Sequence, residues 1–285
     1  MTYANPDALI DTETLARLMR APDVRVVDAT WFLPNANRNA RQEYEACHIP
    51  GAVHFDIDDI ADSGTDLPHM LPSPEKFSSR VRKLGLGDGN RIVVYDANGG
   101  FMAAHRVWWM FRIFGHDDVA VLDGGLKKWI AEERPTEDLP PMPRERHFTA
   151  RFDHTLVRTF DQMLANIKDR HEQVADARSR ARFEAKEPEP RAGLRSGHIP
   201  GSVSLPFQEF MDTKNNFVMR PATDIKAALA RAGIDARKPV VASCGSGVTA
   251  ASVAFALYLI GHERAAVYDG SWTEWGGRDD APIEA

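Results

Sequence analysis

Hydrophobic positions follow two alternating patterns along the chain. Short apolar runs, such as Val-Val-Ala-Ser at 240–243, predict buried strands. Longer segments with helical periodicity, such as 74–84 and 223–232, lie between these runs and predict amphipathic helices. Strands that alternate with helices are typical of units in which helices flank a mainly parallel sheet. The pattern therefore predicts an α/β fold.

The same series of segments occurs twice, at an offset of 146 to 150 residues. The matched pairs are 26–29 with 174–177, 48–51 with 198–201, 92–96 with 240–244, and 123–124 with 269–270. Between the two series, the proline-rich stretch from Arg134 to Asp153 lacks sustained periodicity and is interpreted as a linker. We therefore predict two similar α/β domains, residues 1–145 and 146–285, with the boundary near residue 145.

Both halves contain the sequence His-Ile-Pro-Gly, at 48–51 and 198–201. Because it occurs in both halves, only one of which carries a cysteine after the matched strand, we interpret it as a turn and not as part of a catalytic site. Cys47 precedes the first copy and corresponds to Gly197 before the second, so we interpret Cys47 as a packing residue.

Composition excludes several classes of protein. The chain has 285 residues, of which 43% are hydrophobic, and a net charge of -6. No apolar run approaches the ~20 residues of a membrane span, the first residues lack the features of a leader peptide, and the acidic balance argues against a nucleic-acid partner. Two cysteines without CxxC or HExxH spacing predict no disulfide framework and no metal site. We expect a cytoplasmic protein without membrane contact.

The segment Cys-Gly-Ser-Gly-Val-Thr-Ala at 244–250 holds the most informative residue, Cys244. It follows the strand at 240–243 and precedes an apolar helical segment, 248–260, which Gly261 ends. Loop N–H groups and a helix N-terminus favour negative charge, and a thiolate is the reactive form of cysteine. We predict a nucleophile, whereas the alternative is a buried structural cysteine. Asp96 occupies the matched position, so the first half is predicted to be noncatalytic.

Together, the repeated halves, both His-Ile-Pro-Gly segments, the Asp-Gly pairs and the Cys244 loop resemble the two-domain rhodanese-type sulfurtransferases over nearly the whole chain. Within that family, Cys-Gly-Ser-Gly-Val-Thr resembles the loop of members that use 3-mercaptopyruvate, whereas thiosulfate-preferring members carry basic residues just after the cysteine. The resemblance implies two rhodanese-like domains and a site at the Cys244 loop. The loop residues implied to bind substrate are Gly245, Gly247, Val248 and Thr249.

The resemblance also implies residues outside the loop. Arg182 and Arg191, nine residues apart, match the arginines that anchor the substrate in the family. Asp58, His69 and Ser246 are similar to a proposed proton relay near the nucleophile. A histidine oriented by a carboxylate is a reasonable proton carrier near neutral pH.

We therefore expect sulfur to move from 3-mercaptopyruvate through a Cys244 persulfide to an acceptor, with release of pyruvate and no cofactor. The resemblance implies that the acceptor is cyanide, a small thiol or a thioredoxin-like protein. One alternative is a thiosulfate:cyanide sulfurtransferase, and another is a noncatalytic rhodanese-like binding module. A cysteine-based phosphatase would need an arginine six positions after the cysteine, where this chain has Ala250.

Overall fold

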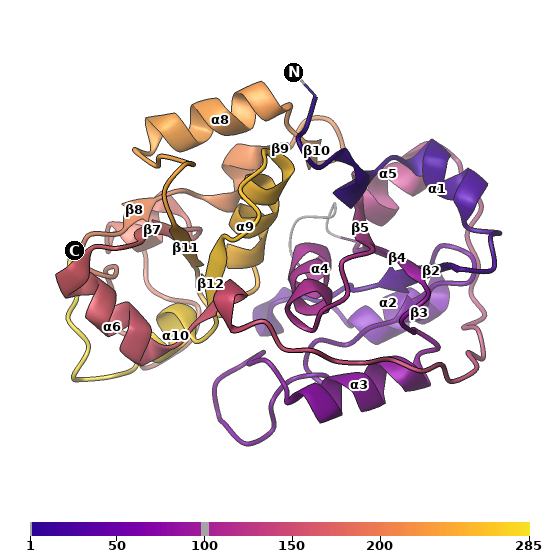
Figure 1. Ribbon diagram of the computed structural model, residues 1–285, viewed down its shortest axis with the longest axis horizontal. Helices are drawn as coiled ribbons and strands as arrows, with labels where there is room; N and C mark the ends of the chain where they lie inside the picture. Colours follow the sequence, from indigo (N-terminus) through magenta and orange to yellow (C-terminus); the bar gives the residue numbers. More distant parts are fainter. Residues whose placement is uncertain (1, 98–102) are drawn as a thin grey trace.

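Two five-stranded parallel sheets form the centres of the two halves in this computed structural model, which describes residues 2–97 and 103–285 (Figure 1). The first sheet has the order β1-β5-β4-β2-β3 and the second the order β6-β12-β11-β7-β8. Strand by strand, the second order repeats the first, as the internal repeat predicts. The α/β fold is therefore confirmed.

The elements have the following bounds. The strands of the first sheet are β1 (Leu9–Ile10), β2 (Val24–Asp28), β3 (Val53–His54), β4 (Arg91–Tyr95) and β5 (Val119–Leu122). Those of the second are β6 (Val157–Arg158), β7 (Gln173–Asp176), β8 (Val203–Ser204), β11 (Val240–Ser243) and β12 (Ala266–Tyr268), and β9 (Met211–Asp212) pairs with β10 (Val218–Met219) in a small antiparallel hairpin. The helices are α1 (Thr12–Leu18), α2 (Ala40–Ala46), α3 (Pro74–Lys83), α4 (Ala103–Ile113), α5 (Gly125–Ala131), α6 (Phe160–Asp169), α7 (Arg180–Phe183), α8 (Ala222–Arg231), α9 (Ala250–Leu259) and α10 (Ser271–Trp275).

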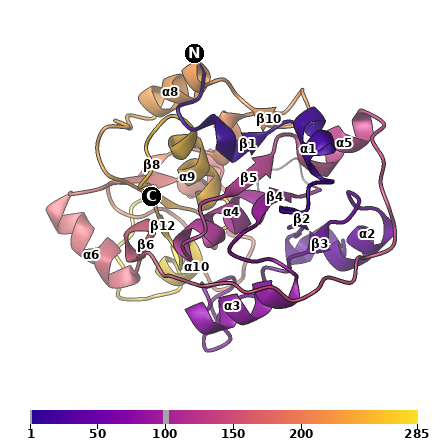
Figure 2. The same ribbon diagram turned by 45° about the vertical axis from the view of Figure 1, so that its right-hand side comes forward.

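Strands β4 and β11 are central in their sheets and almost wholly apolar, which explains their continuous hydrophobic runs. Helices α4 and α9 are apolar around most of their circumference, and a helix of that kind is stable only when it is buried on all sides. They lie side by side between the two sheets (Figures 1 and 2). One apolar core runs through both halves, so the two halves have a fixed relative position.

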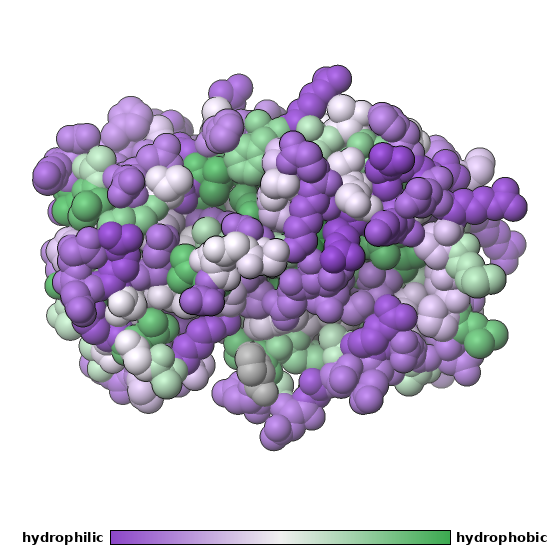
Figure 3. Space-filling model, turned by 90° about the horizontal axis from the view of Figure 1, so that it is seen from below, coloured by the Kyte–Doolittle hydropathy of each residue, from purple (hydrophilic) through white to green (hydrophobic). Residues whose placement is uncertain are grey.

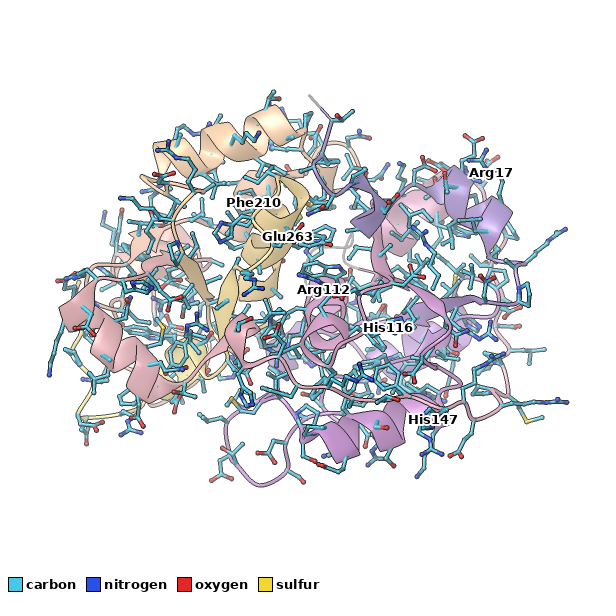
Figure 4. All side chains as sticks on the ribbon, in the orientation of Figure 1. Arg17, Arg112, His116, His147, Phe210 and Glu263 are labelled. Carbon is cyan, nitrogen blue, oxygen red and sulfur yellow. The ribbon has the colours of Figure 1, made fainter. Side chains whose placement is uncertain are left out.

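The two halves also meet through polar contacts. Arg112 on α4 lies near Glu263, which follows α9 (Figure 4), and its Nη1 donates to the Glu263 carbonyl at 3.5 Å. At the N-terminus, Ala4 N–H donates to Leu259 O at 2.8 Å, so the first residues pack on the second half.

Hydrophilic side chains cover most of the face seen in Figure 3, where hydrophobic ones form separate areas. No helix in the described part of the chain has the length and apolar character needed to span a bilayer.

The segment 134–153 contains neither helix nor strand, in agreement with its prolines. It packs on the first half: the Asp88 N–H donates to the carbonyl of His147, which lies beside α3 (Figure 4), and Phe148 is buried against Phe77. The domain boundary near residue 145 remains a prediction.

The two His-Ile-Pro-Gly segments form matching turns. Gly51 and Gly201 have φ angles of +76° and +74°, in the left-handed region that favours glycine. The Nδ1 atoms of His48 and His198 contact the carbonyls of Tyr44 and Phe183 at 2.7 and 2.9 Å. These contacts agree with the prediction of a structural role.

Candidate active site

The loop Cys244–Thr249 joins the end of β11 to the start of α9, where the sequence predicts a tight turn. Gly247 has a φ of +75°, and a Cβ atom there would lie 2.8 Å from both the Asp269 carbonyl oxygen and Arg106 Nη1. Only glycine fits without displacing these groups. The loop is therefore held in one conformation by close contacts on both sides.

Ser271, at the start of α10, organises the same loop. Its Oγ accepts hydrogen bonds from the N–H groups of Cys244 and Gly247, each at 3.1 Å, and donates to the Tyr268 carbonyl at 2.8 Å. The Gly247 N–H is thus engaged within the protein, and the expected role of Gly247 in substrate binding remains a prediction.

The remaining loop amides point to an anion site. In residues 2–97 and 103–285, the N–H groups of Gly245, Ser246, Val248 and Thr249 donate to no acceptor of the protein. Successive free N–H groups beside a helix N-terminus bind negatively charged groups. These amides are available to stabilise a charged sulfur or a substrate oxygen.

Cys244 is 1% exposed and packs in the apolar core. Burial alone would suit a structural cysteine, but the matched residue of the first half indicates another property of this position. There, Asp96 Oδ2 accepts a hydrogen bond from the Ala104 N–H of α4 at 3.0 Å. The fold therefore places an acidic side chain at a helix N-terminus in one half and the thiol in the other, so this position suits a negative charge.

Arg182 and Arg191 converge beside the loop. A Cβ atom at Gly245 would lie 3.2 Å from Arg182 Nη2 and 4.0 Å from Arg191 Nη1. Arg182 is oriented by hydrogen bonds to Glu189. The structure thus brings both predicted arginines next to the residue that follows Cys244.

Arg191 is electrostatically linked to the thiol. Burial lowers the pKa of the Arg191 guanidinium, whereas an ionised Cys244 opposes this shift, and Arg182 adds to it. A guanidinium remains charged at any ordinary pH. Two cations therefore adjoin Cys244 without any basic residue in the loop.

His69 and Asp58 form a pair in the segment before α3. His69 Nδ1 lies 2.6 Å from Asp58 Oδ1, and Trp31 Nε1 donates to Asp58 Oδ2 at 2.8 Å. Burial by itself would raise the pKa of Asp58, but the contacts with His69 and Trp31 and the charge of Arg191 outweigh it and lower the pKa. The structure brings together these two members of the predicted relay, with Asp58 ionised at neutral pH.

The third member, Ser246, is 6% exposed. In the described part of the chain it makes no hydrogen bond to His69. Instead, His69 Nε2 lies 3.4 Å from Arg191 Nη2, a contact between the two halves. The geometry places His69 beside Arg191, which is predicted to anchor the substrate, and the link from His69 to Ser246 remains a prediction.

Sequence reasoning missed the group that joins these parts. Arg106, from α4, has a side chain that is 0% exposed, and its guanidinium donates to Asp269 Oδ1 at 2.7 Å, to His69 O at 2.5 Å and to Gly247 O at 3.2 Å. Asp269 Oδ2 also accepts the Leu71 N–H at 2.8 Å. Arg106 lies in the middle of a helix that is mainly apolar apart from His105 and Arg112, and this position is the signal that could have indicated such a partner.

No cluster of three metal-ligating side chains occurs within residues 2–97 and 103–285. The polar groups around Cys244 are instead two guanidinium groups, free amides and an imidazole. This arrangement can bind an anionic substrate and expose it to a sulfur nucleophile.

Comparison with known proteins agrees with this arrangement. Residues 11–132 and 159–278 each match the rhodanese-like domain family. The 3-mercaptopyruvate sulfurtransferase of Homo sapiens is 41% identical over 273 residues, covering 94% of this chain and 91% of that protein, and the thiosulfate sulfurtransferase of Mus musculus is 42% identical over 274 residues with the same coverage. The crystal structure of SseA from Escherichia coli, described as a 3-mercaptopyruvate sulfotransferase, aligns with a TM-score of 0.85 at 36% identity, covering 93% of this chain and 98% of that one. This chain therefore belongs to the rhodanese family, in which it is a member with two rhodanese-like domains.

Proposed function

We propose that this chain transfers sulfur from 3-mercaptopyruvate through a persulfide on Cys244. The observation that carries the proposal is the convergence of Arg182 and Arg191 on Gly245, next to Cys244. In the donor, the carbonyl carbon adjoins the carbon that bears sulfur, and the carboxylate lies one carbon farther away. The arginines that bind these two groups must therefore lie beside the nucleophile and not in its loop. The similarity to 3-mercaptopyruvate sulfurtransferases supports the same donor.

In the first step, the Cys244 thiolate attacks the sulfur atom of the donor. A sulfur–sulfur bond forms, and the bond between sulfur and the donor CH₂ breaks, with its electron pair passing into the enolate of pyruvate. The enolate takes up a proton and leaves as pyruvate. Arg182 and Arg191 orient the carboxylate and carbonyl and stabilise the developing oxyanion, with charge-assisted hydrogen bonds of about 1.5–3 kcal/mol each.

In the second step, an acceptor attacks the outer sulfur of the Cys244 persulfide and restores the thiolate. Cyanide leaves as thiocyanate, whereas a thiol leaves as its own persulfide. The free amides of Gly245, Ser246, Val248 and Thr249 hold the negative charge of the persulfide between the steps. A small thiol or a thioredoxin-like protein is the acceptor that we propose.

Proton movement falls to His69. Asp58 fixes the ring through Nδ1, which leaves Nε2 directed towards Arg191 and hence towards the bound carboxylate or carbonyl. His69 then carries the proton released from the donor thiol to the enolate. Ser246 is proposed to assist from the loop.

Thiosulfate is the second candidate donor. Relatives at 41–42% identity include both 3-mercaptopyruvate and thiosulfate sulfurtransferases, and two arginines also attract a dianion. Gly245 and Ser246 place no cation immediately after Cys244, which favours the keto acid.

For the location we propose the cytoplasm, where free thiol acceptors are abundant. The support is the presence of only two cysteines, without a disulfide framework. One relative from Arabidopsis thaliana, a thiosulfate/3-mercaptopyruvate sulfurtransferase, is mitochondrial by name.

A side-by-side assay tests the proposed donor. Purified protein is given 3-mercaptopyruvate or thiosulfate with cyanide, and thiocyanate formation is followed for both donors, with pyruvate formation for the first. We expect a higher kcat/KM for 3-mercaptopyruvate. A higher kcat/KM for thiosulfate would assign the second candidate.

A further inference from the structure

A pocket of about 390 Å³ lies in the first half, at the carboxyl end of β2 and away from the Cys244 loop. Its volume is within the range of small-molecule sites, about 300–1,000 Å³. Asp28, Thr30, Cys47 and Leu126 are among the residues that line it. The internal repeat shows what fills the matching space in the second half.

In the second half, the matching space holds the side chain of Arg178, which is 0% exposed. Its guanidinium donates to Asp176 Oδ1 at 3.0 Å, to Asp176 Oδ2 at 2.6 Å and to Gly197 O at 2.8 Å. The guanidinium carbon lies 4.2 Å from the centroid of the Trp272 ring. The arginine therefore has a carboxylate, a carbonyl and an aromatic face around it.

Arg178 and three of the residues that contact it have counterparts at the pocket. The pairs are Asp176 with Asp28, Arg178 with Thr30, Gly197 with Cys47, and Trp272 with Leu126. The backbone geometry is the same: the Thr30 N–H donates to Asp28 Oδ1 at 2.8 Å, and the Arg178 N–H donates to Asp176 Oδ1 at 3.0 Å. The pocket thus corresponds to the space that the Arg178 guanidinium fills in the second half, and the first half has Thr30 in place of that arginine.

Asp28 occupies the position of Asp176, but Thr30 replaces the arginine that pairs with Asp176. Asp28 is 1% exposed, and its Oδ2 has no hydrogen-bond partner in the described part of the chain. Burial raises the pKa of Asp28 by more than the interactions with Thr30 and Tyr95 and the charge of His54 lower it. A buried carboxyl oxygen without a partner is costly, and a cationic donor would satisfy it.

The nearby basic groups donate no hydrogen bond to Asp28 Oδ2 in the described part of the chain, although the charge of His54 acts on this carboxyl group. Arg38 is held by Glu43, with Nε 2.7 Å from Oε1, and the Lys127 ammonium lies 4.7 Å from the centroid of the Phe217 ring. Glu43 also lines the pocket, so a second carboxylate faces it, as Glu189 does beside Arg178.

We propose that this pocket binds a small guanidinium or amidinium compound, whose cation occupies the place that Arg178 fills in the second half. Its planar group donates two parallel hydrogen bonds to Asp28. The apolar remainder of the ligand lies against Leu126 and Ile130, which also line the pocket. The site is separate from sulfur transfer and does not rest on the proposed function.

Alkylation of Cys47 tests the proposal with methylguanidinium as the probe. In the Cys244→Ser variant Cys47 is the remaining thiol, because the chain has two cysteines. At a probe concentration about ten times its Kd, mass action leaves about a tenth of the pockets open, so alkylation of Cys47 should slow about tenfold. Methylurea, which has a similar shape but no charge, should leave the rate unchanged. No protection by the probe, or equal protection by methylurea, would overturn the proposal.

Two further substitutions, made in the Cys244→Ser variant, show whether the probe protects Cys47 by binding in this pocket. Thr30→Arg restores the arginine of the second half, so it should raise Tm and abolish the effect of the probe on Cys47. Thr30→Ser keeps the hydroxyl that accepts the Ala97 N–H at 3.0 Å and leaves the pocket open, so it should retain protection. Undiminished protection in Thr30→Arg would place the probe elsewhere and contradict the inference.

Discussion

Arg106, from the first half, and Asp269, from the second, form a buried ion pair with 2.7 Å between Nη1 and Oδ1, and their side chains are 0% and 5% exposed. The same guanidinium holds the carbonyls of His69 and Gly247. Removing one partner of a buried pair leaves the other charge without compensation. The pair therefore couples the relative position of the halves to the geometry around Cys244.

Arg106→Met should lower both stability and activity. Loss of one partner of a buried ion pair costs about 3–5 kcal/mol. Displacement of the loop and of His69 by ~1 Å should lower kcat about 100-fold. Thermal unfolding and steady-state kinetics measure both effects, with Asp269→Asn as a milder variant that keeps the side-chain size. Arg112→Met is the matched control on the same helix, because Arg112 also contacts the second half but lies outside the site. Parent-like kinetics in both Arg106→Met and Asp269→Asn would remove the pair from the account.

Arg191→Met should impair use of 3-mercaptopyruvate without unfolding the protein. The variant loses one charge-assisted hydrogen bond to the substrate, which is worth about 1.5–3 kcal/mol, or about a 10- to 100-fold lower kcat/KM. Arg182→Met should give a loss of the same order. Arg180→Met is the control, since Arg180 lies on the same short helix as Arg182 and is exposed. If all three variants had the same kinetics as the parent, neither arginine would anchor the substrate.

His69→Gln should change the pH dependence of turnover. General acid–base groups contribute about 10²–10⁴-fold to rate, so kcat should fall at least 100-fold and lose the pH-dependent limb due to the imidazole. The pKa of Asp58 is below its ordinary value, so Asp58 stays ionised near neutral pH and adds no pH-dependent limb to the rate profile there. His171→Gln, at an exposed position, is the control. An unaltered pH–rate profile in His69→Gln would exclude proton transfer by this residue.

Asp123 makes stability depend on pH at the contact between the halves. Its Oδ1 accepts the Met219 N–H at 2.8 Å, and burial raises the pKa of Asp123 from 3.8 to about 6, more than this hydrogen bond lowers it. The pKa of Asp123 is higher in the folded state than in the unfolded state, so the folded state binds the proton more tightly. Protonation of Asp123 therefore stabilises the folded state at low pH. Stability is lost as the pH rises from about 4 to about 6, and the full penalty, about 3 kcal/mol, applies above that range.

Asp123→Asn keeps the acceptor oxygen and removes the charge, so it should raise Tm relative to the parent at pH 7.5 and give little gain at pH 4. Asp138→Asn, an exposed residue of the same half, removes the same charge without burial and should change neither value. A Tm difference for Asp123→Asn that is independent of pH would contradict the raised pKa.

Much of the fold could be predicted because its signals are local. Strand β11 and helix α9 follow from an apolar run and from a helix bounded by Gly261, although the observed helix begins at Ala250 and not at Val248. The repeat extends this interpretation to the first sheet, since matched segments bury the same faces. Asp96 shows the value of the repeat most clearly, because its contact with the Ala104 N–H explains what the thiol position favours.

The contacts that complete the site could not be predicted, because they join distant positions. Arg106 and Asp269 are 163 residues apart, and Arg191 and His69 are 122 apart. No periodicity relates such positions, and they meet only where the two halves of the folded chain pack against each other. The role of the Ser271 hydroxyl in holding the Cys244 and Gly247 amides is equally invisible in a sequence that shows only a serine after a glycine.

The central claim is that the buried Cys244 carries the transferred sulfur. Mass spectrometry of the intact protein and of its peptides after incubation with 3-mercaptopyruvate, without acceptor, tests it most directly. We expect the mass of one additional sulfur atom on the peptide with Cys244, its loss after addition of cyanide, and no gain on the peptide with Cys47. An unmodified Cys244 during continued release of pyruvate would contradict the account.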